Sequence, residues 1–452
     1  LLCSFLSNLQ SSMVSYTELV KKQREFYYSG ATNELAGRKK RIETFKKLLV
    51  ENKKALDDAI FADLHRSSFS DVDGTLREVE NTLKHIDEWV QPRKVPITEP
   101  GMLSADTDSL HIVNEPLGVV LIISPWNFPL VTSAPLIAAL AAGNTVIVKP
   151  SELDPTFSAL FAKLVSKYFD EKELAVVEGG AAETTELLKE RFDHILYTGC
   201  PPVAKIIMAA AARFLTPVTL ELGGKNPVVV DESADLSLLS QGIVFAKLLN
   251  AGQICVCADY IVTTPEMKSK VVAALSAAFD ALGDMSKVEA NARIVNDRHF
   301  KRLLTLLEKT KGKVVYKAGG EISPSDRFIP VHLIDVDVND EFMKEEIFGP
   351  LLPILTLPSF DATLDYVKRN EKPLASYLYT VNEEQAKRFI KETSSGGVTV
   401  NGIMSHGFAS GMPFGGVGNS GMGRINGKFS FDTFSHEKPV CVRASLKPNL
   451  GL

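Results

Sequence analysis

The sequence has few cysteines, no long apolar run and no block of basic charge. Only five cysteines occur in 452 residues, too few for a disulfide framework, and none has the spacing of a zinc site. No apolar run approaches the ~20 residues that a helix needs to cross a bilayer. The formal net charge is −5, without a basic stripe that would attract nucleic acid. These absences predict a reducing, cytoplasmic setting, with no transmembrane anchor, metal site or nucleic-acid partner.

The first residues lack the features of a signal peptide. Residues 1–9 are apolar, but the run is short and no basic segment precedes it. The chain also begins without methionine, which makes Met13 a candidate start and residues 1–12 a candidate extension.

Strand-like and helix-like runs alternate from residue 119 onward. Apolar runs at 119–124, 145–148, 174–177, 194–197 and 217–221 are separated by helix-like runs at 132–141, 158–169, 182–189 and 203–213. This alternation predicts a parallel sheet covered on both faces. A second series with the same rhythm runs from 226 to about 400. Before them, 16–88 resemble amphipathic helices, and 91–111 a connector or exposed arm. The predicted fold is therefore α/β, with two Rossmann-like lobes joined by irregular segments.

Cys255 is the leading candidate for a catalytic residue. It lies on a glycine-loosened connection between a helix-like run, 236–249, and a strand-like run, 260–264. Backbone N–H groups pointing at its sulfur would favour the thiolate, which attacks electrophiles. The alternative from this window is a buried apolar filler, because free cysteine is among the most buried residue types.

Polar residues follow the predicted strands, where ligand crevices of α/β sheets lie. Asn127, in a turn frozen by two prolines, can donate to a developing oxyanion; a plain asparagine turn is the alternative. Lys149 and Glu152 can bind the hydroxyls of a nucleotide ribose, and the carboxylate would repel a 2′-phosphate, which favours NAD over NADP. A surface salt bridge between them is the alternative.

Two further segments at strand ends are candidates. Glu221, between leucines and two glycines, has an apolar setting that raises a carboxyl pKa and suits a base; pairing with Lys225 is the alternative. A turn at Gly199 and Cys200 leads through Pro201 and Pro202 into a helix, 203–213, whose N-terminus can face a pyrophosphate.

The remaining glycine-rich segments give weaker signals. Glu346 and Phe348 flank a glycine turn, where an exposed helix end and a core phenylalanine are the alternatives to a cofactor site. Gly416–Gly421 matches G-x-G-x-x-G but follows no clear strand, so we interpret it as a tight irregular loop and not as a dinucleotide motif.

Six segments in this order resemble the signatures of the aldehyde dehydrogenase superfamily. They are Pro-Trp-Asn at 125–127, Lys-Pro-Ser-Glu at 149–152, Glu-Leu-Gly-Gly-Lys at 221–225, Gly-Gln-Ile-Cys at 252–255, Glu-Ile-Phe-Gly-Pro at 346–350 and Pro-Phe-Gly-Gly-Val-Gly-Asn-Ser-Gly at 413–421. The resemblance covers residues 13–440 and is strongest to the class 3, fatty aldehyde branch.

The resemblance implies oxidation of aldehydes, medium- or long-chain aliphatic or aromatic, to carboxylic acids with NAD, or with NADP. Cys255 would form a thiohemiacetal and then a thioester, Asn127 would form the oxyanion hole, and Glu221 would activate the hydrolytic water. The cofactor site would comprise Lys149, Glu152, Gly199, Cys200, Pro201, Pro202, Val203, Ala204, Glu346 and Phe348. The alternatives are a catalytically silent NAD-binding structural protein and a CoA-acylating dehydrogenase.

The resemblance also implies three domains and a homodimer. The NAD-binding domain would span 13–92 and 112–220, the catalytic domain 221–405, and a bridging, dimerising element 93–111 and 406–440. The sequence departs from the family pattern in three places. Cys200 and Ala204 replace usual pyrophosphate-loop residues, and residues 405–410 differ from the usual wording of the branch. The sequence also ends without the hydrophobic anchor of many fatty aldehyde members, so we expect a soluble form.

Overall fold

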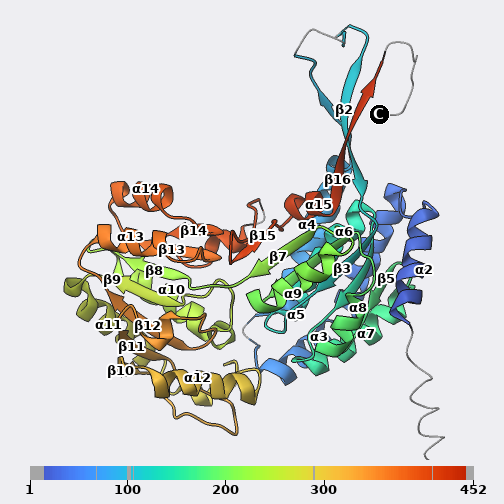
Figure 1. Cartoon of the computed structure of the whole chain (residues 1–452). Helices are drawn as coiled ribbons and strands as arrows, with labels where there is room; N and C mark the ends of the chain where they lie inside the picture. Colours follow the sequence, from blue (N-terminus) through green and yellow to red (C-terminus); the bar gives the residue numbers. More distant parts are fainter. Residues whose placement is uncertain are drawn as a thin grey trace, which may run out of the picture.

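The computed structural model describes residues 15–67, 69–98, 103–104, 106–288, 291–409 and 411–443. These residues form a six-stranded sheet, a seven-stranded sheet and a three-stranded sheet, with helices packed on the two larger ones (Figure 1). The predicted α/β fold class is confirmed.

The six-stranded sheet has the order β15-β7-β6-β3-β4-β5. Its neighbours are parallel except for β15, which lies antiparallel to β7. The strands are β3 (Val119–Ile123), β4 (Thr145–Lys149), β5 (Leu174–Val176), β6 (His194–Gly199), β7 (Val218–Leu222) and β15 (Gly421–Met422).

Both faces of this sheet are buried, as the continuous apolar strands predict. In β3, Val120 and Ile122 face one cluster, whereas Val119, Leu121 and Ile123 face another. The first cluster is covered by α3 (Leu35–Leu64), α4 (Asp71–Trp89), α5 (Pro129–Ser133), α6 (Pro135–Ala142), α7 (Pro155–Tyr168) and α15 (Lys428–Thr433). The second is covered by α2 (Tyr16–Tyr28), α8 (Ala181–Leu187) and α9 (Pro201–Ala212).

The single helix predicted at 132–141 is wrong. The chain forms two helices there, α5 and α6, which meet at Ala134. Pro135 has no N–H to continue the first helix, and its fixed φ suits the first position of the next one.

The seven-stranded sheet has the order β10-β11-β12-β9-β8-β13-β14, and only β10 is antiparallel to its neighbour. Its strands are β8 (Pro227–Val230), β9 (Tyr260–Thr263), β10 (Lys313–Lys317), β11 (His332–Val336), β12 (Leu351–Thr356), β13 (Ala375–Tyr379) and β14 (Gly397–Val400). The helices of this lobe are α10 (Leu236–Leu248), α11 (Pro265–Asp280), α12 (Asp297–Lys309), α13 (Phe360–Arg369) and α14 (Glu383–Glu392). Short 3-10 turns are η1 (Leu249–Gly252), η2 (Met285–Lys287), η3 (Glu341–Met343) and η4 (Ser405–Phe408).

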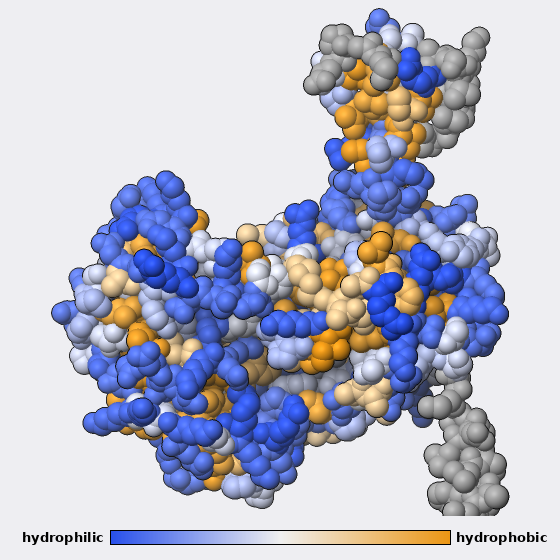
Figure 2. All heavy atoms as spheres, viewed as in Figure 1, coloured by the Kyte–Doolittle hydropathy of each residue, from blue (hydrophilic) through white to orange (hydrophobic). Residues whose placement is uncertain are grey.

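The third sheet projects from the body as an arm (Figure 1). Its strands are β1 (Arg93–Val95), β2 (Ser109–Pro116) and β16 (Ser435–Val442), and both pairings are antiparallel. All residues of β2 are half-buried, and Figure 2 shows apolar side chains gathered on the arm above a largely polar base. In the described part of the chain, no helix combines the length and apolarity that crossing a membrane requires.

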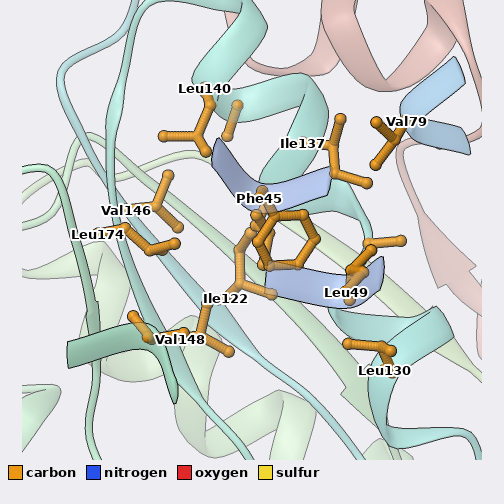
Figure 3. Packing of buried hydrophobic residues seen from close by; sticks show 14 of the residues in the cluster. Phe45, Leu49, Val79, Ile122, Leu130, Ile137, Leu140, Val146, Val148 and Leu174 are labelled. Atoms are coloured by element: carbon orange, nitrogen blue, oxygen red, sulfur yellow. The ribbon is translucent and has the colours of Figure 1, made fainter. Parts of the chain in front are cut away.

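Phe45, on α3, lies in the middle of the first core cluster, where its side chain packs toward α6 and the sheet (Figure 3). Because its side chain is fully buried, we expect Phe45→Ala to lower the free energy of unfolding by about 3–5 kcal/mol in urea denaturation. Val50, on the same helix, is 58% exposed, and Val50→Ala should change it by less than about 0.5 kcal/mol. Similar losses for both variants would contradict this assignment of the core.

Candidate active site

Cys255 lies in the loop between η1 and β9, at the seam between the two larger sheets. It is a free, half-buried thiol, whereas Cys257 is buried and its sulfur lies 3.4 Å from the Ala246 carbonyl oxygen. The apolar-filler interpretation therefore fits Cys257. The Asn226 side chain holds the Cys255 loop in place. Its amide donates to the carbonyl oxygens of Cys255 and Cys257, at 2.7 and 2.9 Å.

The environment of Cys255 favours the thiol. Burial raises its pKa to about 12, and the nearby carboxyls of Glu346 and Glu221 add to the effect. Backbone N–H groups of Val256 and Cys255 bond to the sulfur and act in the opposite direction. These groups favour the thiolate, as expected, but desolvation outweighs them and the pKa rises on balance.

Asn127 follows β3 and reaches across the seam to the cysteine loop. Its buried amide donates to the Gln253 carbonyl oxygen at 3.1 Å, two residues before Cys255. In return, the Asn250 amide donates to the carbonyl oxygens of Asn127 and Gln253, each at 3.1 Å. The side chain therefore does more than stabilise its own turn.

The turn before Cys255 has an unusual backbone. Asn250 and Ala251 have φ of 53°, and Gly252 has φ of 72°. A Cβ on Gly252 would lie 2.5 Å from the carbonyl oxygen of Gly349, so only glycine fits between these two segments. Buried Lys247, at the end of α10, joins the same two segments by donating to the carbonyl oxygens of Gly349 and Leu351.

Glu221 lies in β7 with its carboxyl buried and unpaired. Neither oxygen bonds to any residue that the structure describes, and burial raises its pKa well above the usual value. The alternative partner, Lys225, forms an ion pair with Asp259 instead. A base that is desolvated and unbonded remains available to a small molecule.

The glycine-rich loop at 413–421 covers Glu221. Gly421 pairs with Glu221 across β15 and β7, and a Cβ on Gly415 would lie 3.3 Å from a Glu221 oxygen. The sequence identified this loop as tight and irregular, but its contact with the carboxyl could not be predicted from the motif.

Glu346 and Phe348 lie beside these groups in the segment before β12. Burial raises the pKa of Glu346 to about 8, and the Gly224 N–H that bonds to its carboxyl opposes the rise. Glu346 is half-buried and not on a helix, so the exposed-helix-end alternative is wrong. The half-buried ring of Phe348 contacts Trp126 edge-to-face at 5.5 Å.

The other predicted cofactor residues lie at the carboxyl ends of β4 and β6. Lys149 is buried and donates to the Pro150 carbonyl oxygen at 2.6 Å, while the exposed Glu152 carboxylate lies 4.0 Å from its Nζ. The two groups form an ion pair whose lysine end is buried, which differs from an ordinary surface salt bridge. Because β7, β6, β3 and β4 are neighbours in the sheet, Glu221, Gly199, Asn127 and Lys149 come from adjacent strand ends.

Gly199 and Cys200 form the turn before α9. A Cβ on Gly199 would lie 2.1 Å from the Tyr197 hydroxyl oxygen, and that hydroxyl accepts the Cys200 N–H at 3.0 Å. Pro201 and Pro202 begin α9, Val203 is 38% exposed, and Ala204 is 2% exposed.

Comparison with known proteins agrees with the resemblance. The model of the aldehyde dehydrogenase family matches residues 14–440. The chain belongs to the aldehyde dehydrogenase family. A dimeric NADP-preferring aldehyde dehydrogenase from Rattus norvegicus is 43% identical over 442 residues, 96% of each chain. Aldehyde dehydrogenase family 3 member A2 from Pongo abelii is 44% identical, covering 95% of this chain and 88% of that protein.

A solved structure gives the same answer for the fold. The substrate-bound state of Staphylococcus aureus AldH aligns with a TM-score of 0.90 and 36% identity, over 94% of this chain and 93% of that one. The predicted superfamily, its class 3 branch and an oxidoreductase acting on aldehydes with NAD or NADP are thereby confirmed. The two alternatives, a silent structural protein and a CoA-acylating enzyme, gain no support from these relatives.

Two residues that support the candidate site were given no role in the sequence analysis: Gln253, although it lies in the 252–255 signature, and Tyr377, which lies in no signature. Gln253 donates to the carbonyl oxygens of Asn250 and Arg293 and accepts the Val295 N–H. The Tyr377 hydroxyl donates to the Val256 carbonyl oxygen at 2.5 Å. The one available signal was a polar residue within an apolar run, as with Tyr377 in β13. Among the residues that the structure describes, no group of three or more His, Cys, Asp or Glu side chains could hold a metal ion.

The raised pKa of Cys255 has a measurable consequence. Only the thiolate is alkylated, so without cofactor the rate of Cys255 alkylation by iodoacetamide should rise about tenfold per pH unit from about pH 7 to 10. Mass spectrometry of the peptide that contains Cys255 gives this rate, and exposed Cys200 in the same digest controls for reagent decay. A plateau near pH 8 would mean that the thiolate is already formed there.

Proposed function

We propose that Cys255, Asn127 and Glu221 catalyse the oxidation of an aldehyde to a carboxylic acid in this enzyme. The observation that carries the proposal is their convergence: a half-buried thiol, an amide bonded to the loop before it, and a carboxyl close enough to influence its pKa. Nucleophile, oxyanion donor and base are the groups that acyl chemistry at sulfur requires.

In the first step the Cys255 thiol loses its proton to solvent, and the resulting thiolate attacks the aldehyde carbon. A carbon–sulfur bond forms, and the carbonyl electron pair moves onto oxygen. Asn127 has two amide N–H groups, of which one bonds to Gln253, so the other can donate to the oxyanion. When bound, NAD(P) supplies the acceptor for the hydride that leaves this carbon, and the cysteine is left as a thioester.

The second half of the reaction is hydrolysis of that thioester. Neither Glu221 oxygen bonds to a residue that the structure describes, and its raised pKa lets the carboxylate take a proton from water. The hydroxide equivalent adds to the acyl carbon, the carbon–sulfur bond breaks, and the carboxylic acid leaves.

The residues at the strand ends fit a dinucleotide. A buried lysine beside an exposed carboxylate, Lys149 and Glu152, suits the adenosine ribose, and Glu346 suits the second ribose, with Phe348 beside the ring. Gly199 to Ala204 suit the pyrophosphate at the start of α9. Glu152 favours NAD, although the rat relative is named NADP-preferring.

The domain division, assembly and location complete the proposal. The division given above, with NAD-binding, catalytic and bridging parts, follows the three sheets in outline. The rat relative is named dimeric, and the half-exposed arm has strand edges and apolar side chains that suit pairing with a second subunit. The four free cysteines among the described residues suit a reducing cytoplasm. Medium- or long-chain aliphatic or aromatic aldehydes are the proposed substrates.

Replacement of the nucleophile tests the central role. Cys255→Ala should abolish NADH formation from a medium-chain aldehyde and leave NAD binding, measured calorimetrically, within about twofold, because the sulfur forms the covalent intermediate. Cys257→Ala removes a thiol two residues away and should retain most of the activity. Near wild-type turnover by Cys255→Ala would rule out the mechanism.

Replacement of the base separates the two halves of the reaction. Glu221→Gln should give a burst of about one NADH per active site and then a very slow steady state, because only hydrolysis needs the base. The acyl group should remain on Cys255 as a mass increase of its peptide. Loss of the burst would mean that Glu221 acts earlier, and normal turnover would point to another base, with Glu346 the first candidate.

A further inference from the structure

An ion pair behind the Asn127 turn is completely buried. Arg66 and Asp71 bond through Nη2 and Oδ2, and both side chains are 0% exposed. Arg66 follows His65, whose left-handed backbone, with φ of 51°, ends α3, and Asp71 is the first residue of α4. The turn between two long helices therefore directs both side chains into the protein.

Both members of the pair hold the residues that follow Asn127. The Asp71 carboxylate accepts the backbone N–H groups of Leu130 and Val131, the latter at 3.4 Å. The Arg66 guanidinium lies 4.2 Å from the centroid of the Phe128 ring, a cation–π distance. Figure 3 shows Leu130 packed near Leu49 of α3, so this turn has contacts beyond the one that Asn127 makes with Gln253.

The same segment also reaches the cysteine loop. The Arg293 N–H donates to the Leu64 carbonyl oxygen at 3.0 Å, and the Arg293 carbonyl oxygen accepts from the Gln253 amide at 3.0 Å. We call Leu64, Arg66 and Asp71 the brace. The brace reaches the cysteine loop through the two hydrogen bonds of Arg293. It reaches the Asn127 turn through the contacts of Asp71 and Arg66.

Stability alone is a poor reason for this arrangement. Two Arg66 nitrogens, Nε and Nη1, are buried and bond to no residue that the structure describes. Buried donors without partners cost stability, and an apolar pair of similar volume often stabilises a protein more than a buried ion pair does. Features that break such rules occur most often where a site must be held in place.

We propose that Arg66 and Asp71 are positioning residues that hold the Asn127 amide at the oxyanion, an inference that rests on the role proposed above for Asn127. Asp71 fixes the backbone of the turn and Arg66 fixes the Phe128 ring. The brace acts only through Asn127, so its loss should affect the chemical step and not the binding of aldehyde or cofactor.

Two matched double variants separate the hydrogen-bonding role from the charge. Arg66→Met with Asp71→Asn removes both charges but keeps an oxygen that accepts the backbone N–H groups. Arg66→Met with Asp71→Leu has similar volume and no acceptor. The leucine version should lose about 10- to 100-fold in kcat, since small misplacements and lost oxyanion donors have effects of this order. The asparagine version should stay within about threefold, and KM and the Kd of NAD within about twofold in both.

A second ion pair provides the structural control. Arg24 bonds to Asp193 at 2.7 Å, and Asp193 also accepts the Val119 N–H at 2.8 Å, yet neither contacts the Asn127 turn. Arg24→Met with Asp193→Leu should lower stability without lowering kcat. A similar fall in kcat in this control would reduce the brace to a general stabilising feature and overturn the proposal.

Coupling to Asn127 is the decisive measurement. In an Asn127→Ala background the leucine version should cause no further loss of kcat, because its effect passes through the missing amide. Independent, multiplying losses in the two backgrounds would overturn the proposal.

Amide hydrogen exchange tests the proposal without an activity assay and without the leucine variant. A neutral acceptor bonds more weakly than a carboxylate, so the asparagine version should speed exchange of the Leu130 and Val131 amides about tenfold and leave β4 unchanged. Unchanged exchange at those amides would overturn the positioning role. A wild-type enzyme that oxidises no aldehyde would instead refute the proposed function, while this exchange result would still decide whether the brace holds the turn.

Discussion

The hydrogen bond from the Asn127 amide to the Gln253 carbonyl oxygen joins the two lobes at the proposed reaction centre. Asn127 follows a strand of one sheet, whereas Gln253 precedes Cys255 at the edge of the other. Gln253 also uses its amide nitrogen and oxygen, for Asn250, Arg293 and Val295. A fully bonded side chain in a buried place has one favourable geometry. The relative position of amide and thiol is therefore set by the same contacts that close the seam.

The Glu221 carboxyl, proposed as the base, is unpaired at this seam among the residues that the structure describes. Other buried charges nearby are paired, such as Lys225 with Asp259 and Lys247 with two carbonyls. Glu221 has no such partner, and burial raises its pKa as it raises that of Cys255. A neutral acid and a neutral thiol are cheaper to bury than their ions. Burial therefore favours the uncharged form of both groups.

The sequence predicted what depends on local pattern and missed what depends on distant contacts. Val/Ile/Leu runs identified β3 to β7 to within a residue or two, because strands buried on both faces leave a continuous apolar signature. Cys255, Asn127 and Glu221 were found as polar residues at strand ends and loops. Gln253 and Asp71 were not, since their partners lie 126 and 60 residues away in the chain. The net rise in the Cys255 pKa could not be predicted for the same reason: burial is a property of the assembled lobes.

At the start of α9, the contacts of Cys200 and Ala204 show which departure from the family motif affects the backbone N–H groups available to a pyrophosphate. Ala204 replaces a usual residue of the pyrophosphate loop, but its methyl packs in the core beneath the helix and its N–H bonds to the Cys200 carbonyl. Pro201 and Pro202 have no N–H to offer, and that of Cys200 is taken by Tyr197. These bonds leave the Val203 N–H as the donor of the first turn. If the pyrophosphate binds here, its affinity must come mainly from the helix dipole and from the ribose contacts of Lys149 and Glu152. At this turn the two prolines, which offer no N–H, then limit the contacts to a pyrophosphate more than the methyl of Ala204 does.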